Sequence, residues 1–158
     1  MFFKRLKIDK MVQFSRSAIK AIFVIFFLSL GTNGCKKDYT STIPYIYVDF
    51  SFNPTSYIEL TIPGGSIYFP NAGYGGIIVF RDLIDSSNPF LAFDATCTYE
   101  VSSIIRVTAD GSGLATCPEC KSQFILFGGN GSSTKGPAAE PLKQYHTYYS
   151  GGRIQIRN

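Results

Sequence analysis

The sequence predicts an all-β domain, built as a small antiparallel sandwich or barrel. Residues 45–52 alternate apolar and polar side chains in the stretch YIYVDFSF, which is the two-residue period of a half-buried strand. Turn-forming stretches rich in Gly, Pro, Asn and Ser, such as IPGG, PNAGYGG and DSSNP, recur between short apolar runs. No sustained helical period is visible. Many short strands joined by regular turns are typical of sandwiches and barrels.

The strands can be placed in order along the chain. In the first, Ile46, Val48, Phe50 and Phe52 are expected to face the core. In the stretch GRIQIRN, Ile154 and Ile156 are expected to face the core in the same way. Between these two, strands are predicted at residues 66–70, 76–81, 90–94, 105–109, 124–127 and 146–149.

A leader precedes this domain. Residues 1–34 carry six Lys or Arg against one Asp and contain the apolar run AIFVIFFLSL at 21–30. A bilayer-spanning helix needs about 20 apolar residues, so this run indicates a signal peptide. The following GTNGC places a small residue before Cys35, the pattern of a lipoprotein cleavage site. We therefore predict a signal peptide at 1–34, a tether at 35–44 acylated on Cys35, and a domain at 45–158, held to a membrane of the bacterial cell envelope on the periplasmic side or at the surface.

Charge excludes one class of partner. The whole chain has a net charge of +4, with 15 basic and 11 acidic residues. Removing the leader leaves nine basic and ten acidic residues, a net charge of −1. No basic patch remains to neutralise phosphates, so nucleic acid is not an expected partner.

Two cysteine-containing loops are the candidate site. The stretches ATCTYE (95–100) and TCPECKSQF (116–124) contain Cys97, Cys117 and Cys120, and 19 residues separate the first two. The intervening residues are typical of a strand pair, so both loops should leave the same end of a small β unit. In an oxidising envelope compartment, neighbouring thiols can bind a metal or pair as a disulfide.

These loops and the tail after them resemble the Rieske-type [2Fe–2S] domain family. That family has a Cys-x-His loop, a Cys-x-x-His-Gly-Ser-x-Phe/Tyr loop, and a Gly-Pro-Ala…Pro-Leu…Tyr tail. This chain has Cys97-Thr-Tyr99, then CPECKSQF, then GGNGSSTKGPAAEPLKQY at 128–145. The resemblance implies a Rieske-like β fold in which Cys97 and Cys117 are metal ligands, Ser122 is a hydrogen-bond donor to a ligand sulfur, and GPAAEPL is a proline loop over the cluster.

The histidines of that family are replaced. Tyr99 and Cys120 stand at the two histidine positions, and the only histidine, His146, lies far along the chain. A centre with two cysteine and two histidine ligands is therefore not expected, and a Ser-His-Asp catalytic set cannot be built around one distant histidine.

Three states of the site stay open at this point. The first is a [2Fe–2S] cluster ligated by Cys97, Cys117, Cys120 and either Tyr99 or a carboxylate. The second is a zinc site on the same cysteines. The third has no metal and joins two of the three cysteines in a disulfide. The first predicts a non-enzymatic electron-transfer lipoprotein with a periplasmic redox partner, and the other two predict a structural or interaction module whose old cluster site is closed.

Overall fold

A computed structural model describes residues 41–84 and 86–158 of the chain. The predicted signal peptide and Cys35 lie outside these residues, and both stay predictions. Within the described ranges the secondary structure consists of strands and short 3-10 helices, without an α-helix. None of these described helices could cross a membrane. The elements are β1 (Asp49–Phe52), η1 (Pro54–Ser56), η2 (Ile58–Thr61), β2 (Ser66–Phe69), β3 (Ile77–Arg81), β4 (Phe90–Asp94), β5 (Thr108–Ala109), β6 (Leu114–Thr116), β7 (Gln123–Ile125), η3 (Phe127–Gly129), β8 (Ser133–Lys135), β9 (Gln144–Ser150) and β10 (Arg153–Arg157).

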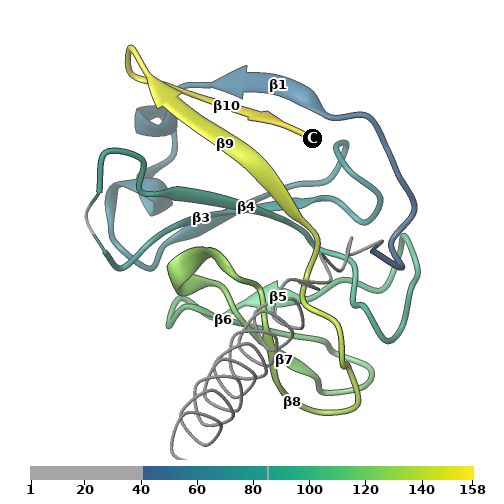
Figure 1. Cartoon of the computed structure of the whole chain (residues 1–158). Coiled ribbons are helices and arrows are strands. Elements are labelled where there is room, and N and C mark those ends of the chain that lie inside the picture. The colour runs from purple at the N-terminus through teal and green to yellow at the C-terminus, as the bar shows by residue number, and fades with distance from the viewer. Residues whose placement is uncertain (1–40, 85) are drawn as a thin grey trace, which may run out of the picture. The chain divides into compact units, whose positions relative to one another are not determined.

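Among the described residues, ten strands form two antiparallel sheets, shown in Figure 1. The larger sheet has the order β1-β10-β9-β4-β3-β2 and the smaller has the order β5-β6-β7-β8. The smaller sheet is inserted between β4 and β9, which pair directly through Ala92 opposite Tyr145. The chain therefore leaves the larger sheet after β4, builds the unit that contains the cysteine loops, and returns through β9.

The larger sheet curls until its two edge strands approach each other. The ring of Phe69 on β2 lies 5.2 Å from that of Phe50 and 4.9 Å from that of Phe52, both on β1. These centroid distances are typical of packed aromatic pairs. No ladder joins β1 to β2, so the sheet is a half-barrel closed by side chains. The predicted class, an all-β antiparallel sandwich or barrel with two cysteine loops at one end, is confirmed.

Each sheet contributes to a separate hydrophobic core. The core of the half-barrel includes Ile77, Val79 and the β10 residues Ile154 and Ile156. The inward direction predicted for the two β10 isoleucines is confirmed, since both are fully buried. The second core, formed by the smaller sheet against β3 and β4, includes Phe80, Phe93, Ala115, Phe124, Leu126, Cys97 and Cys117. Two cysteines of the candidate site are thus part of a packed core.

The first predicted strand begins later than its alternation indicates. Residues 45–48 lie outside the strand, and the ladder of β1 starts at Asp49 opposite Arg157, although Val48 still forms hydrogen bonds with Asn158. Val48 is buried as predicted, but Ile46 is exposed, which corrects its predicted inward direction. Pairing stops here because β10 ends, so alternation continues in the sequence without a partner strand.

Candidate functional site

The three cysteines of the described domain meet at one end of the smaller sheet. Cys97 lies just after β4, Cys117 follows β6, and Cys120 lies in the turn before β7. Their sulfur atoms all lie within 4.8 Å of one another. The Sγ atoms of Cys97 and Cys120 are 3.5 Å apart. Two loops separated in sequence therefore form one cluster of free thiols.

A tight turn in the β6–β7 hairpin brings Cys120 back toward Cys117. The amide of Cys117 donates to the carbonyl of Ser122 at 2.9 Å, and the amide of Lys121 donates to the carbonyl of Cys117 at 3.2 Å. Lys121 has φ of 61°, and it is the one non-glycine residue with positive φ in the described chain. A left-handed backbone at this point lets the chain reverse between Cys117 and β7.

Ser122 links the second cysteine loop to the proline loop. Its side chain is fully buried, and its Oγ lies 3.1 Å from the Sγ of Cys120. The amide of Ala138 donates to the same Oγ at 3.1 Å. A Cβ on Gly136 would lie only 2.6 Å from the Cα of Ser122. The proline loop therefore packs closely on the serine that contacts the Cys120 sulfur.

A buried carboxylate fixes the start of the first cysteine loop. Asp94, at the end of β4, accepts hydrogen bonds from the amide and hydroxyl of Thr96 at 3.0 and 2.6 Å. It also accepts from the amides of Tyr74 and Gly75 and from the hydroxyl of Tyr145, the last at 2.8 Å. Five donors satisfy a group that burial would otherwise strongly destabilise. Thr96 directly precedes Cys97, so this network positions the first ligand.

Sequence reasoning did not identify the Asp94 network. The available signal was an acidic residue inside an otherwise apolar strand, in the stretch FLAFDA. Such a residue is rarely left buried without partners, but the sequence does not say which donors reach it. Here they come from the turn before β3, from Thr96, and from β9.

The thiols differ in their electrostatic environment. Burial raises the pKa of Cys97 to about 12, and this effect outweighs hydrogen bonds from the backbone of Glu100 and Tyr99. At Cys120, burial also acts to raise the pKa, but hydrogen bonds from Ser122 and the neighbouring thiols outweigh it and hold the pKa below its ordinary value. Cys120 is also only partly buried. Ionisation therefore starts more readily at Cys120 than at Cys97.

The other predicted site residues lie differently. Tyr99, two residues after Cys97 in the same loop, is 56% exposed. His146 lies on β9, opposite Arg157 of β10, with an exposed side chain. Among the residues that the structure describes, no histidine or carboxylate joins the three sulfurs. The predicted roles of Cys97, Cys117, Cys120, Tyr99 and Ser122 in holding a cofactor stay predictions.

Comparisons with known proteins bear on the fold. No family model and no curated protein matches the sequence. Among solved structures, the plasma membrane Rieske protein PetC3 of the cyanobacterium Synechocystis PCC 6803 is 23% identical, with a TM-score of 0.53 over 69% of this chain and 99% of that one. The chain has a Rieske-like fold. The ferredoxin of carbazole 1,9a-dioxygenase from Nocardioides aromaticivorans IC177 is 20% identical, with a TM-score of 0.47 over 71% of this chain and 97% of that one.

The donor set decides which form of centre the Rieske-like domain can hold. A Rieske centre places two cysteines on one iron and two histidines on the other, and the second pair has no counterpart among the described residues. A histidine-ligated cluster therefore does not fit. Three thiolates do suit a thiolate-ligated centre on one tetrahedral ion, whose sulfur ligands lie about 3.8 Å apart; the Cys97 and Cys120 sulfurs are 3.5 Å apart. In a [2Fe–2S] cluster only two ligands on the same iron lie this close, so the third cysteine would have to move outward to reach the second iron. A fourth ligand must come from another group.

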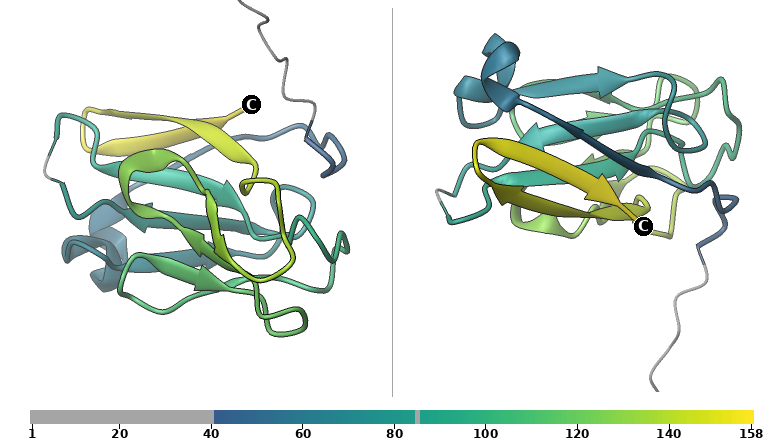
Figure 2. Two further views of the ribbon diagram at one scale, coloured as in Figure 1. Left: turned by 60° about the horizontal axis from the view of Figure 1, so that its bottom comes forward. Right: turned by 90° about the horizontal axis from the view of Figure 1, so that it is seen from above.

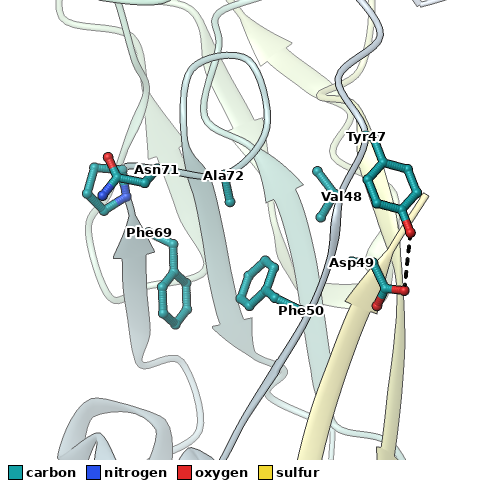
Figure 3. Close-up of a pocket in the computed structure, with 8 residues that line it drawn as sticks. Tyr47, Val48, Asp49, Phe50, Phe69, Asn71 and Ala72 are labelled. Atoms are coloured by element: carbon teal, nitrogen blue, oxygen red, sulfur yellow. Dashed lines mark hydrogen bonds between the residues drawn. The ribbon is translucent and has the colours of Figure 1, made fainter.

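A separate groove lies at the seam of the half-barrel, away from the cysteines. It has a volume of about 370 Å³ and is bounded by Tyr47, Val48, Asp49 and Phe50 on one side and by residues 69–72 on the other. Figure 3 shows the rings of Phe50 and Phe69 directed toward each other across it. Asp49 is the sole acidic side chain in its lining, and the Tyr47 hydroxyl lies 3.4 Å from it. The groove offers apolar surface but no set of groups for catalysis.

Proposed function

We propose that this protein is a lipid-anchored redox protein of the bacterial cell envelope, whose Rieske-like domain holds a thiolate-ligated iron–sulfur cluster. The observation that supports it best is the meeting of three cysteine sulfurs within 4.8 Å, contributed by the two loops that follow β4 and β6. In this proposal Cys97, Cys117 and Cys120 are ligands, and Tyr99 is the nearest candidate in sequence for the fourth.

The proposed activity is electron transfer with a periplasmic redox partner, and no catalytic reaction is assigned to the chain. A bound cluster would supply reversible one-electron oxidation and reduction. The protein would contribute the rest. The buried Asp94 network fixes the Cys97 loop. The Ser122 hydroxyl lies 3.1 Å from the Cys120 sulfur and would donate to it once that sulfur is ionised. Hydrogen bonds to ligand sulfurs and burial are the ordinary means by which a protein adjusts such a centre.

A second function is favoured by the 3.5 Å contact between the sulfurs of Cys97 and Cys120. Thiols this close can also be joined by oxidation or can share a zinc ion. The domain would then be a structural or interaction module in which a disulfide or a zinc ion takes the place of the cluster.

One measurement separates the two functions. Full-length protein is extracted in detergent without oxygen, and iron, zinc and acid-labile sulfide are quantified per chain. Iron and sulfide in equal amounts support the redox protein. Zinc without sulfide, or two fewer thiols without any metal, contradicts the redox proposal and supports the closed module. Cys97→Ser is the matched variant, since it should abolish iron binding in the first case.

The anchor is tested separately. Cys35→Ser removes the acylation site predicted from the GTNGC stretch, so the domain should move from the membrane fraction to the soluble fraction. Cys120→Ser is the control and should remain in the membrane fraction. Unchanged membrane partitioning of Cys35→Ser would contradict the lipid anchor.

A further inference from the structure

Hydrogen bonds and a buried side chain hold the N-terminal end of the described chain beside the cysteine site. Ile43 is buried, and both the amide and the hydroxyl of Thr42 donate to the carboxylate of Glu140, at 3.3 and 3.0 Å. Glu140 lies in the proline loop, and its carbonyl accepts a hydrogen bond from the hydroxyl of Thr98 at 2.8 Å. Thr98 directly follows Cys97. Glu140 thus connects Thr42, at the end of the tether, to the first cysteine loop.

The free part of the tether is therefore short. Thr42 lies seven positions after Cys35, a stretch that reaches at most ~25 Å when fully extended. A domain of this size has a radius of gyration of about 13 Å and a breadth of roughly 35 Å. The tether is shorter than the domain is broad. A chain anchored at Cys35 must therefore keep the end of the domain near Thr42 close to the bilayer, and it cannot turn the opposite end to the membrane.

The loop between β4 and β5 exposes apolar side chains at that same end. Ile104 is 82% exposed, Tyr99 is 56% exposed, and Val101 is also exposed. Residues 101–105, VSSII, contain no charged side chain. Both views in Figure 2 place this loop and the first described residues on the same side of the domain, opposite the η1–η2 segment. Exposed Ile and Val side chains in this uncharged stretch suit the boundary between lipid headgroups and acyl chains. Glu100, between Tyr99 and this stretch, would lie on the headgroup side.

We propose that the loop of residues 101–104 rests on the bilayer surface, so that the cysteine site faces the membrane. The proposal builds on the lipid anchor at Cys35, and it adds which face of the domain the anchor presents to lipid. The contact is apolar, so it should form on uncharged phosphatidylcholine. A consequence is that any partner must reach the cysteines at the membrane surface and not from the open compartment.

The chain has no tryptophan, so a single introduced tryptophan reports its own position. Ile104→Trp is compared with Ile58→Trp, which replaces the same residue type in η2, where Ile58 is 75% exposed at the far end of the domain. The full-length acylated variants are reconstituted into phosphatidylcholine vesicles with brominated acyl chains, which quench tryptophan at the bilayer. The Ile104→Trp variant should emit at shorter wavelength with vesicles than without them, and its fluorescence should be quenched several-fold more strongly than that of Ile58→Trp.

Val101→Trp provides a second report from the same loop and should behave as Ile104→Trp does. Equal quenching of the variants at positions 58 and 104, or no quenching at 101 and 104, would overturn the orientation. Mass spectrometry of the same samples establishes whether Cys35 is acylated. An acylated chain without quenching contradicts the orientation alone, whereas a chain without acyl groups removes the anchor and the orientation together.

Discussion

Lys121 holds the left-handed backbone of the second cysteine loop, with φ of 61°. In the Rieske family that the loop resembles, a glycine stands at this position. Because a left-handed conformation costs an L-residue roughly 1–2 kcal/mol, and glycine loses more entropy on folding, Lys121→Gly should stabilise the domain by about 0.5–1 kcal/mol. Chemical denaturation checks this, with Lys135→Gly as the control because Lys135 has no positive φ. A less stable Lys121→Gly would show that the lysine side chain, which bonds the carbonyl of Pro118, outweighs the backbone strain.

Ser122 lowers the pKa of Cys120, although burial acts in the opposite direction. The hydroxyl can donate to the thiolate and so stabilise the ionised form. Ser122→Ala removes this donor, so the pKa of Cys120 should rise and its alkylation at neutral pH should slow. The rate of iodoacetamide reaction with metal-free protein, measured against pH, should shift its midpoint to higher pH. Cys97 and Cys117 are buried, so the reaction reports Cys120. A midpoint that does not move would contradict the assigned hydrogen bond, and Ser133→Ala serves as the control.

At the scale of elements, the Tyr145–Asp94 hydrogen bond ties β9 to the end of β4. Both side chains are buried and the bond is 2.8 Å long. Burial and the charge of Asp94 raise the pKa of Tyr145, so the phenol remains a donor over the physiological range. Tyr145→Phe leaves a buried carboxylate one donor short, which should cost about 1.5–3 kcal/mol of stability.

The matched control for Tyr145→Phe is an exposed tyrosine. The hydroxyl of Tyr47 lies 3.4 Å from the carboxylate of Asp49, but both side chains are exposed, and exposed polar pairs contribute little. Tyr47→Phe should therefore leave the melting temperature nearly unchanged. Equal effects of the two substitutions in thermal unfolding would mean that the Asp94 network does not depend on its tyrosine.

Elements with local signals could be predicted from the sequence. The alternation in RIQIR predicts β10, and the apolar run before Arg81 predicts β3, because burial on one or both faces shows in the residue types. The strand β8, with the sequence STK, could not be predicted, since it has no apolar pattern and forms by pairing with β7. The 3-10 helices at residues 54–61 were missed for the same reason: a short turn of helix leaves no period in the sequence.

At the scale of the molecule, the meeting of the cysteine loops was predictable but the half-barrel seam was not. The strand pair between Cys97 and Cys117, with the Rieske resemblance of the tail, placed the two loops at one end. The approach of β1 to β2 depends on the accumulated twist of six strands, which no local pattern encodes. The hydrogen bond from Thr42 to Glu140 could not be predicted either, because it joins residues 98 positions apart in the sequence.

The cluster of thiols also joins distant parts of the chain, and this gives a prediction for the metal-free protein. The sulfurs of Cys97 and Cys120 are 3.5 Å apart. Oxidation should therefore link this pair and leave Cys117 as a thiol. A bridge that closes a loop of about 24 residues contributes about 3.5 kcal/mol in the chain-entropy model.

Peptide mapping of oxidised protein, with thermal unfolding before and after reduction, checks this pairing. Cys117→Ser should still form the bridge and gain stability on oxidation, whereas Cys120→Ser should not gain as much. The 3.5 Å spacing of the Cys97 and Cys120 sulfurs is the physical reason for the difference. If the map instead shows Cys117 joined to Cys120, the bridge would close only the tight turn of the second loop, and it would not tie the first cysteine loop to the hairpin. The stability gain would then be much smaller, and the two loops would be held together by packing and by the Ser122 and Asp94 hydrogen bonds alone.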